Sequence, residues 1–272
     1  MLKKLVVIGS TVLILISCAT SPLGRKQLKL MPSDQMSTMG TEAFEQIKQQ
    51  TPVETNKRIN RYVNCIATAI VQVSTNDSSI KQWETVVFRD DTANAFALPG
   101  GKIGVHTGLL NVAKTQHQLA AVVGHEVAHV LADHSNERVS QEFALQQSMT
   151  LLQALGSPQS PMGQQLMGLL GLGAQMGVIL PYSRKHESEA DEMGLYLMAK
   201  AGFDPRESIR LWQNMSQGEG EGEGEGEGGQ PPEFLSTHPS HENRIARLNQ
   251  TMKRAMQFYQ QAKASGKNPR CN

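Results

Sequence analysis

Residues 116–134 read QHQLAAVVGHEVAHVLADH, an apolar stretch that carries His125, Glu126 and His129 as a His-Glu-x-x-His motif. The apolar spacing predicts a helix, in which residues four apart differ in direction by only about 40°. Both imidazoles therefore leave one face of the helix, one turn apart, and can share a tetrahedral zinc ion, one per chain. Glu126 lies beside them and is suited to act on water as a general base. The alternative is two buried histidines with local hydrogen bonds, which the cost of unpaired polar groups in an apolar helix disfavours.

A zinc ion needs a third protein ligand, and a later segment, residues 183–191 (SRKHESEAD), offers several candidates. Glu187 and Asp191 are four residues apart and share a helical face. Glu187 could complete the zinc site, while Asp191 could accept the outward N–H of a ligating imidazole and fix its tautomer. His186 and Glu189 compete with them, and periodicity alone does not choose between Glu187 and His186.

The composition is typical of a globular protein and indicates no polyanionic partner. The chain has 272 residues, of which 39% are hydrophobic and 19% charged, and its formal net charge is +1. This balance gives no basic footprint for a nucleic acid. Strands are predicted at 82–89, 94–98 and 102–105, and helices as a pair within 33–75 and over 116–134, 137–155, 162–179, 184–201, 205–216 and 241–264. The expected fold class is α+β, mostly helical, with a small β-sheet beside the motif helix.

The N-terminal residues have the pattern of an export signal. Two lysines precede an uncharged apolar run at 5–16, which is too short to span a bilayer. The run ends at Cys18 in a sequence that resembles a bacterial lipobox, where acylation of the thiol would anchor the protein to lipid. An ordinary signal peptide is the alternative, and Ala19, where an Asp would favour the inner membrane, favours the outer one. We therefore expect 1–17 to be a lipoprotein signal peptide, 18–32 a polar tether, and the protein to be periplasmic.

The other two cysteines, Cys65 and Cys271, are expected to pair, because an exported compartment is oxidising. A buried free thiol at Cys65 is the alternative. Residues 33–264 are expected to form a single domain, followed by a C-terminal tail at 265–272. Within the domain, residues 218–229 alternate Gly and Glu, which predicts a disordered loop.

Several short motifs follow one another along the chain in a characteristic order. They are NAFALPGG at 94–101, TGLL at 107–110, HEVAH at 125–129, SRKHESEAD at 183–191, and finally His238-Pro239 and Arg244. Together they resemble the HtpX and CAAX-prenyl-protease family of zinc metallopeptidases (peptidase family forty-eight), over about residues 33–250. The exported lipoprotein members, of the LoiP and BepA type, are the most similar in layout. The resemblance implies a zincin-like metalloprotease domain.

The resemblance also implies roles for individual residues. It makes Glu187 the third zinc ligand and places Asp191 behind the ligands. It puts the loop of His238 near the metal, where the imidazole could either close the open zinc position and hold the enzyme latent or stop short and stabilise an oxyanion. Arg244 could share this second role or brace the loop.

The strand at 94–98, with Asn94, Ala95 and Phe96, could bind an extended peptide at a sheet edge through backbone hydrogen bonds. An interior strand is the alternative. The expected function is that of a lipid-anchored zinc endopeptidase of the bacterial envelope, which degrades unfolded or misassembled exported proteins. A chaperone or assembly factor for outer-membrane proteins, with a mostly latent protease site, is the second hypothesis. A metal-dependent scaffold is the third, and the intact Glu126 disfavours it.

Overall fold

The computed structural model describes residues 18–74, 80, 82–155, 180–217, 234, 238 and 244–272. The described part is mostly helical with two small sheets, which confirms the expected class. The helices are α1 (Ser33–Gln50), α2 (Lys57–Gln72), the 3-10 helix η1 (Thr107–Asn111), α3 (Gln116–Leu131), α4 (His134–Leu155), α6 (Leu180–Lys200), α7 (Glu207–Gln217) and α9 (Arg244–Ala264). The strands are β1 (Cys18–Thr20), β2 (Lys26–Leu28), β3 (Glu84–Phe88), β4 (Ala95–Leu98) and β5 (Lys102–His106).

The larger sheet has three strands in the order β3-β5-β4. β5 runs parallel to β3 and antiparallel to β4, with Ala95 opposite Val105 and Leu98 opposite Lys102. β4 and β5 are joined by a tight turn in which Gly100 and Gly101 have φ of +85° and +77°, a region that glycine enters without strain. β4 therefore lies at an edge of the described sheet, as the peptide-binding hypothesis requires.

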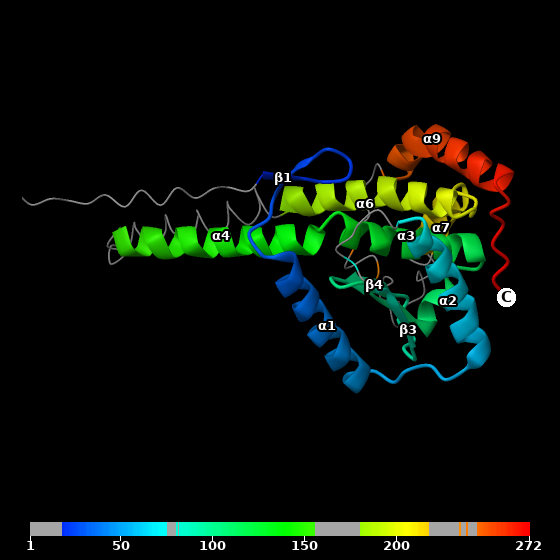
Figure 1. Cartoon of the computed structure of the whole chain (residues 1–272), viewed down its shortest axis with the longest axis horizontal. Helices are drawn as coiled ribbons and strands as arrows, with labels where there is room; N and C mark the ends of the chain where they lie inside the picture. The colour runs from blue at the N-terminus through cyan, green and yellow to red at the C-terminus, as the bar shows by residue number, and fades with distance from the viewer. Residues whose placement is uncertain are drawn as a thin grey trace, which may run out of the picture.

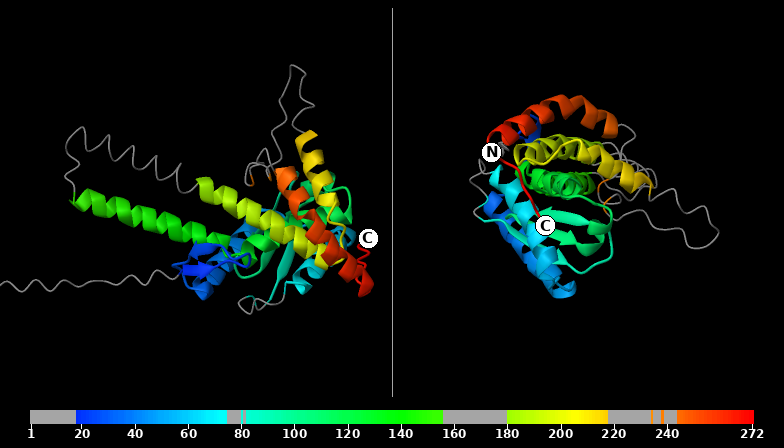
Figure 2. Two further views of the ribbon diagram at one scale, coloured as in Figure 1. Left: turned by 90° about the horizontal axis from the view of Figure 1, so that it is seen from above. Right: turned by 90° about the vertical axis from the view of Figure 1, so that its right-hand side faces the viewer.

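The motif helix α3 lies at the centre of a layered arrangement. Figure 2 shows α9, α6, α3 and the three-stranded sheet stacked in this order. The Thr115 side chain caps α3 by accepting a hydrogen bond from the Gln118 N–H. Most of α3 is buried, which explains why its sequence is apolar nearly all round rather than on one stripe.

α3 and α6 cross closely because each has a glycine at the contact. A Cβ on Gly194 of α6 would come within 2.7 Å of the His125 backbone nitrogen, and one on Gly124 within 2.9 Å of the Gly194 carbonyl oxygen. Two glycines thus let the helix backbones touch, which brings the start of α6 over the motif histidines. A glycine inside a buried helix is a signal of close packing that the sequence alone offers.

In Figure 1, α1 and α2 lie on opposite sides of the three-stranded sheet. α2 buries Val63, Ile66 and Ile70 in the main hydrophobic core. Cys65, also on α2, forms a disulfide with Cys271, which ties the C-terminal tail to this helix across 206 residues. The expected pairing is therefore present in the structure.

Residues 18–32 do not form the free tether that their polar composition indicates. β1 and β2 form a hairpin, with Cys18 opposite Leu28. Figure 1 shows this hairpin beside α4 and α6. Two polar side chains of this segment, Ser21 and Gln27, are buried against the body of the protein. The tether prediction is wrong because these polar groups bind protein partners instead of water, and composition alone cannot distinguish the two.

Among the described residues, no helix combines the length and the apolar character needed to cross a membrane. The helix expected at 162–179 and the Gly-Glu loop at 218–229 lie outside the described residues.

Candidate metal centre

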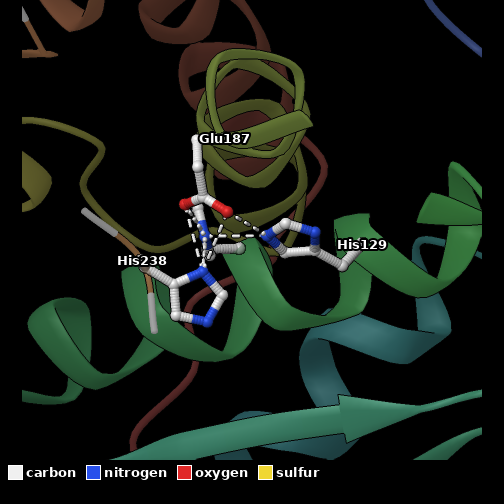
Figure 3. A group of neighbouring side chains, drawn as sticks. His129, Glu187 and His238 are labelled. Atoms are coloured by element: carbon white, nitrogen blue, oxygen red, sulfur yellow. Dashed lines mark hydrogen bonds and ion pairs between the residues drawn. The ribbon is translucent and has the colours of Figure 1, made fainter. Parts of the chain in front are cut away.

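Four side chains from three parts of the chain converge on one point. His125 and His129 come from α3, Glu187 from α6, and His238 from the segment before α9. One donor atom from each lies within 4.8 Å of the others. Figure 3 shows the Glu187 carboxylate reaching down from α6 between His129 and His238. The structure thus brings together residues that the motif and the resemblance single out separately.

The contacts show which atom of each group faces the centre. Nε2 of His129 lies 3.0 Å from Nε2 of His125, as expected for imidazoles one helical turn apart. The two Glu187 oxygens lie 3.3 Å from His125 Nε2 and 3.4 Å from His129 Nε2. Of the two ligand candidates that periodicity left open, Glu187 therefore reaches the centre. His186 points elsewhere, to Glu137 of α4 at 3.1 Å.

The electrostatics of the centre favour a cation. Burial alone would raise the pKa of Glu187, but hydrogen bonds from His125, His129 and His238 hold it well below its usual range. Burial would lower the pKa of His125, but Asp191 and Glu187 raise it to about 9. An ionised carboxylate in a buried pocket of imidazoles is a site that a positive charge stabilises.

This donor set fits zinc. Structural studies of zinc proteins show that the ion takes imidazole nitrogen and carboxylate oxygen in tetrahedral sites, and His125, His129 and Glu187 supply three such donors. His238 offers a fourth donor, whereas a catalytic zinc site keeps its fourth position open for water or substrate. The hypothesis of two structural histidines does not explain why two further donors, from distant segments, meet at the same point.

Glu126 lies beside the ligands without belonging to their cluster. It accepts a hydrogen bond from the backbone of Ala97 in β4, and its Oε1 is 3.3 Å from Nε2 of His238. Burial raises the pKa of the Glu126 carboxyl, while the neighbouring imidazoles partly offset this effect. The residue thus lies between the ligands and the sheet edge.

Asp191 and Arg244 support the site from the C-terminal side. Asp191 Oδ1 lies 2.9 Å from Nδ1 of His125, the ring nitrogen that faces away from the centre. Arg244 donates to Asp191 at 2.6 Å and to the backbone oxygen of His238 at 3.3 Å, and its guanidinium stacks on Trp212 at 3.6 Å. We call Asp191 and Arg244 the C-terminal support. Of the roles considered for Arg244, these contacts favour bracing the loop.

Sequence reasoning missed a second support on the other side. Nδ1 of His134 lies 2.9 Å from Nδ1 of His129, and Nε2 of His134 lies 3.2 Å from Glu189. Glu189 in turn accepts a hydrogen bond from Arg25 of the N-terminal hairpin at 2.8 Å. We call His134, Glu189 and Arg25 the N-terminal support. The signal available in the sequence was a third histidine, five residues after His129.

The three residues expected to bind substrate differ in how they are placed. Phe96 packs its ring against Gly104 and against the rings of Phe44 and Phe88, so its side chain faces the inner aromatic cluster. Asn94 precedes β4 and is buried, and its backbone oxygen accepts from the His106 N–H. Ala95 is buried within β4. The Asn94 carbonyl is thus already paired within the sheet, and the side chains of Ala95 and Phe96 face the interior.

The fold and the four converging donor atoms together form a candidate metal site of the His-Glu-x-x-His type. Residues 54–252 match the profile of peptidase family M48. The match covers more than half of the chain, and the chain therefore belongs to this family, whose cofactor is zinc. The family assignment agrees with the resemblance inferred from the motifs.

Known proteins from two settings are similar to this chain. It is 38% identical to mitochondrial metalloendopeptidase OMA1 of Schizosaccharomyces pombe, with 71% of this chain and 53% of that protein covered. It is 32% identical to the human mitochondrial metalloendopeptidase OMA1, with 88% and 46% covered. It is 27% identical to the beta-barrel assembly-enhancing protease of Yersinia pestis, with 78% and 43% covered. The chain thus spans about half the length of these relatives.

Proposed function

We propose that the chain is a zinc endopeptidase in which His125, His129 and Glu187 hold the metal and Glu126 is the catalytic base. The observation that carries this proposal is the division of roles: donor atoms converge at one point, and an acid with a raised pKa lies beside them against the sheet edge. Zinc held there supplies Lewis-acid activation of water and of the peptide carbonyl. Glu126 takes the proton from the attacking water and later gives it to the leaving amine.

The substrate would be an extended polypeptide. β4 is an edge strand whose Ala97 N–H reaches the Glu126 carboxylate, so a peptide added along this edge would pass the base. Pairing through backbone groups gives affinity with little dependence on sequence. It also requires an extended chain, which favours unfolded or misassembled proteins over folded ones.

We further propose that the protein acts in the bacterial envelope, anchored by lipid at Cys18 and sorted to the outer membrane, as Ala19 favours. The apolar run at 5–16 and the cysteine that follows it support export and acylation. The beta-barrel assembly-enhancing protease among the relatives supports envelope substrates, whereas the OMA1 relatives are mitochondrial. Cys18→Ser should release the protein from membranes, and a wild-type protein without acyl groups by mass spectrometry would contradict the anchor.

A second hypothesis, a chaperone or assembly factor for outer-membrane proteins with a mostly latent protease site, is favoured by His238. Its Nδ1 lies 3.0 Å from Glu187 and 3.3 Å from His125, so the imidazole would compete with water for a metal held by these groups. If the protease site were latent, the β4 edge could still bind a polypeptide without cleaving it.

One experiment separates the two hypotheses. New protein N-termini are profiled in envelope extracts incubated with the zinc-loaded protein and, as a matched control, with Glu126→Gln. An endopeptidase generates termini that the variant does not. Identical profiles, together with equal capture of unfolded outer-membrane proteins by both forms, would support the assembly factor and contradict the endopeptidase.

A further inference from the structure

A second cluster of buried charged and titratable groups lies next to the metal centre. Glu137 and His134 of α4 and Glu189 and His186 of α6 are all nearly inaccessible, with Glu137 fully buried. The two imidazoles stack with centroids 4.4 Å apart. Arg25, from the N-terminal hairpin, reaches into this cluster. None of the five belongs to the ligand set, and the proposed reaction does not use them.

Arg25 joins the two carboxylates of the cluster. Its guanidinium makes two parallel hydrogen bonds to Glu137, both of 2.7 Å, and its Nε donates to Glu189 at 2.8 Å. Burial alone would raise the pKa of both carboxyls, but hydrogen bonds from His186 and Arg25 lower that of Glu137 to about 2, and bonds from His134, Ser21 and Arg25 lower that of Glu189 to about 2. Without Arg25, two buried carboxylates would lose their cationic partner, which is strongly unfavourable.

The cluster is linked to the metal centre through a chain of imidazoles. A metal bound by Nε2 of His129 would leave the proton on its Nδ1, which would then donate to Nδ1 of His134 at 2.9 Å. His134 then has its own proton on Nε2, which donates to Glu189 at 3.2 Å. Glu189 therefore fixes the tautomer of His134, and His134 fixes that of His129. Arg25 holds the carboxylate at the end of this chain.

The same hairpin also holds the backbone that aims His134. Asp133 has φ of +52°, a left-handed conformation that ends α3 and turns His134 back towards His129. Lys29 pairs with the Asp133 carboxylate, and the Gln27 side chain donates to the Ala132 carbonyl at 2.6 Å. Farther along, the Leu30 N–H donates to the Ser140 hydroxyl at 2.8 Å. The junction between α3 and α4 is thus bound by several residues of one short segment.

We propose that the segment Ser21–Met31 positions the metal ligand His129. The segment acts through His134, and Arg25 is its central positioning residue. The segment begins three residues after Cys18. It therefore does not serve as a separate tether. The inference concerns metal binding and holds whichever polypeptide is cleaved.

The test uses the full chain with Arg25→Gln, Arg25→Lys and Arg206→Gln. Arg206 is an exposed arginine that pairs with Asp204 on the surface, so Arg206→Gln is the matched control. Zinc affinity is measured by competition with a chromophoric chelator, and the visible absorption spectrum of the Co²⁺-substituted protein reports the ligand geometry. Turnover and KM on a peptide are measured at saturating zinc.

Arg25→Gln should weaken zinc binding by roughly 3- to 10-fold, less than the 10- to 100-fold that follows the loss of a partner in direct contact with a ligand. It should also change the Co²⁺ spectrum and lower kcat more than it raises KM. Arg25→Lys keeps one charge without the two-pronged contact and should recover part of the affinity. Arg206→Gln should match the wild type.

A purely structural role for the hairpin gives a different result. Arg25→Gln would then lower the melting temperature but leave zinc affinity, the Co²⁺ spectrum and kcat at wild-type values, and this outcome overturns the proposal. If Arg25→Gln does not fold, His134→Phe takes its place, because it keeps the stack on His186 but removes the acceptor for His129. A wild-type Co²⁺ spectrum in His134→Phe would equally overturn it.

Discussion

The two motif histidines are supported in different ways, and the arginines behind them, Arg25 and Arg244, come from opposite ends of the chain. His125 meets a carboxylate directly, since Asp191 lies 2.9 Å from its Nδ1, whereas His129 meets the imidazole of His134, and the carboxylate of Glu189 comes one step later. A directly bound carboxylate makes an imidazole the more basic ligand. The C-terminal support therefore makes His125 a stronger donor, while the N-terminal support mainly fixes the orientation of the His129 ring.

The supports also differ in how firmly they are attached. Arg244 is buried, stacks on Trp212, and belongs to the 21-residue helix α9. Arg25 is carried by a hairpin whose strands have three residues each, and a two-stranded hairpin of this size is not stable alone. The hairpin is held by hydrogen bonds and ion pairs, while its Leu23 and Leu30 side chains are exposed. The N-terminal support therefore depends on polar contacts with the hairpin, whereas the C-terminal support is continuous with a helix of the core.

The largest expected effect concerns the residue that belongs to neither support. Glu126→Gln should lower peptide turnover by roughly 10²- to 10⁴-fold, because a general base is lost, and should keep stoichiometric zinc, because no ligand is lost. Turnover on a peptide and metal content by elemental analysis check both parts. Loss of zinc from the variant would show that Glu126 is a ligand, and the division of roles between base and supports would then be wrong.

The second prediction concerns the buried carboxylate of Glu137, which binds Arg25 of the N-terminal support. Glu137 has a pKa of about 2 in the folded protein against an ordinary value of 4.5, so the unfolded chain binds its proton first as the pH falls. The stability from this group is thus fully present above about pH 5 and is lost as the pH falls towards 2, by about 3 kcal/mol in total. Urea unfolding of the zinc-free protein at pH 7, 5 and 3 measures this loss.

Glu137→Gln should lack this part of the acid sensitivity, although it should be less stable than the wild type at pH 7. Glu142 is an exposed glutamate of the same helix, and Glu142→Gln is the matched control, with the pH dependence of the wild type. Parallel stability curves for the wild type and Glu137→Gln would mean that the buried carboxylate is not held ionised.

The third prediction compares the supports directly. Asp191→Asn should weaken zinc binding by roughly 10- to 100-fold, because it removes the carboxylate that contacts a ligand. Glu189→Gln should have a smaller effect, since His134 stands between it and His129. Chelator competition on both variants gives the order. A larger loss in Glu189→Gln would reverse the assignment of donor strength to the C-terminal support.

The sequence predicted best what depends on local spacing. The elements β3, β4, β5 and α3 lie within a few residues of their expected positions, because period and turn residues are local signals. The motif geometry and the reach of Glu187 follow from helical periodicity together with the order of the motifs. α4, expected from residue 137, begins at His134, because a positive φ at Asp133 ends α3 earlier than its apolar pattern does.

The N-terminal support could not be predicted in this way. Arg25 lies 112 residues from Glu137 and 164 from Glu189 in the sequence, and no periodic pattern relates residues so far apart. A short polar segment with prolines has the same composition whether it is solvated or bound. Only the buried carboxylates on α4 and α6 required a cation, and nothing in the sequence indicated that they were buried together.

The last and smallest effect concerns His238, which can close the site from the side of the C-terminal support. Its Nδ1 contacts Glu187 and its Nε2 contacts Glu126, so it links the ligands to the base. His238→Ala removes the imidazole but keeps the backbone oxygen that Arg244 binds, so this support remains intact. An imidazole in the fourth zinc position excludes the attacking water. We therefore expect turnover to rise several-fold in His238→Ala and zinc affinity to fall slightly.

Steady-state peptide cleavage and chelator competition on the same preparation test this expectation. A rise in turnover with slightly weaker zinc binding identifies His238 as a plug. A fall in turnover at saturating zinc instead assigns His238 to the stabilisation of the oxyanion, because that role acts in the transition state and not on the metal. If both quantities stay at wild-type values, the imidazole has neither role, and its place among the donor atoms reflects loop packing against Phe234, whose ring centroid lies 4.7 Å from its own.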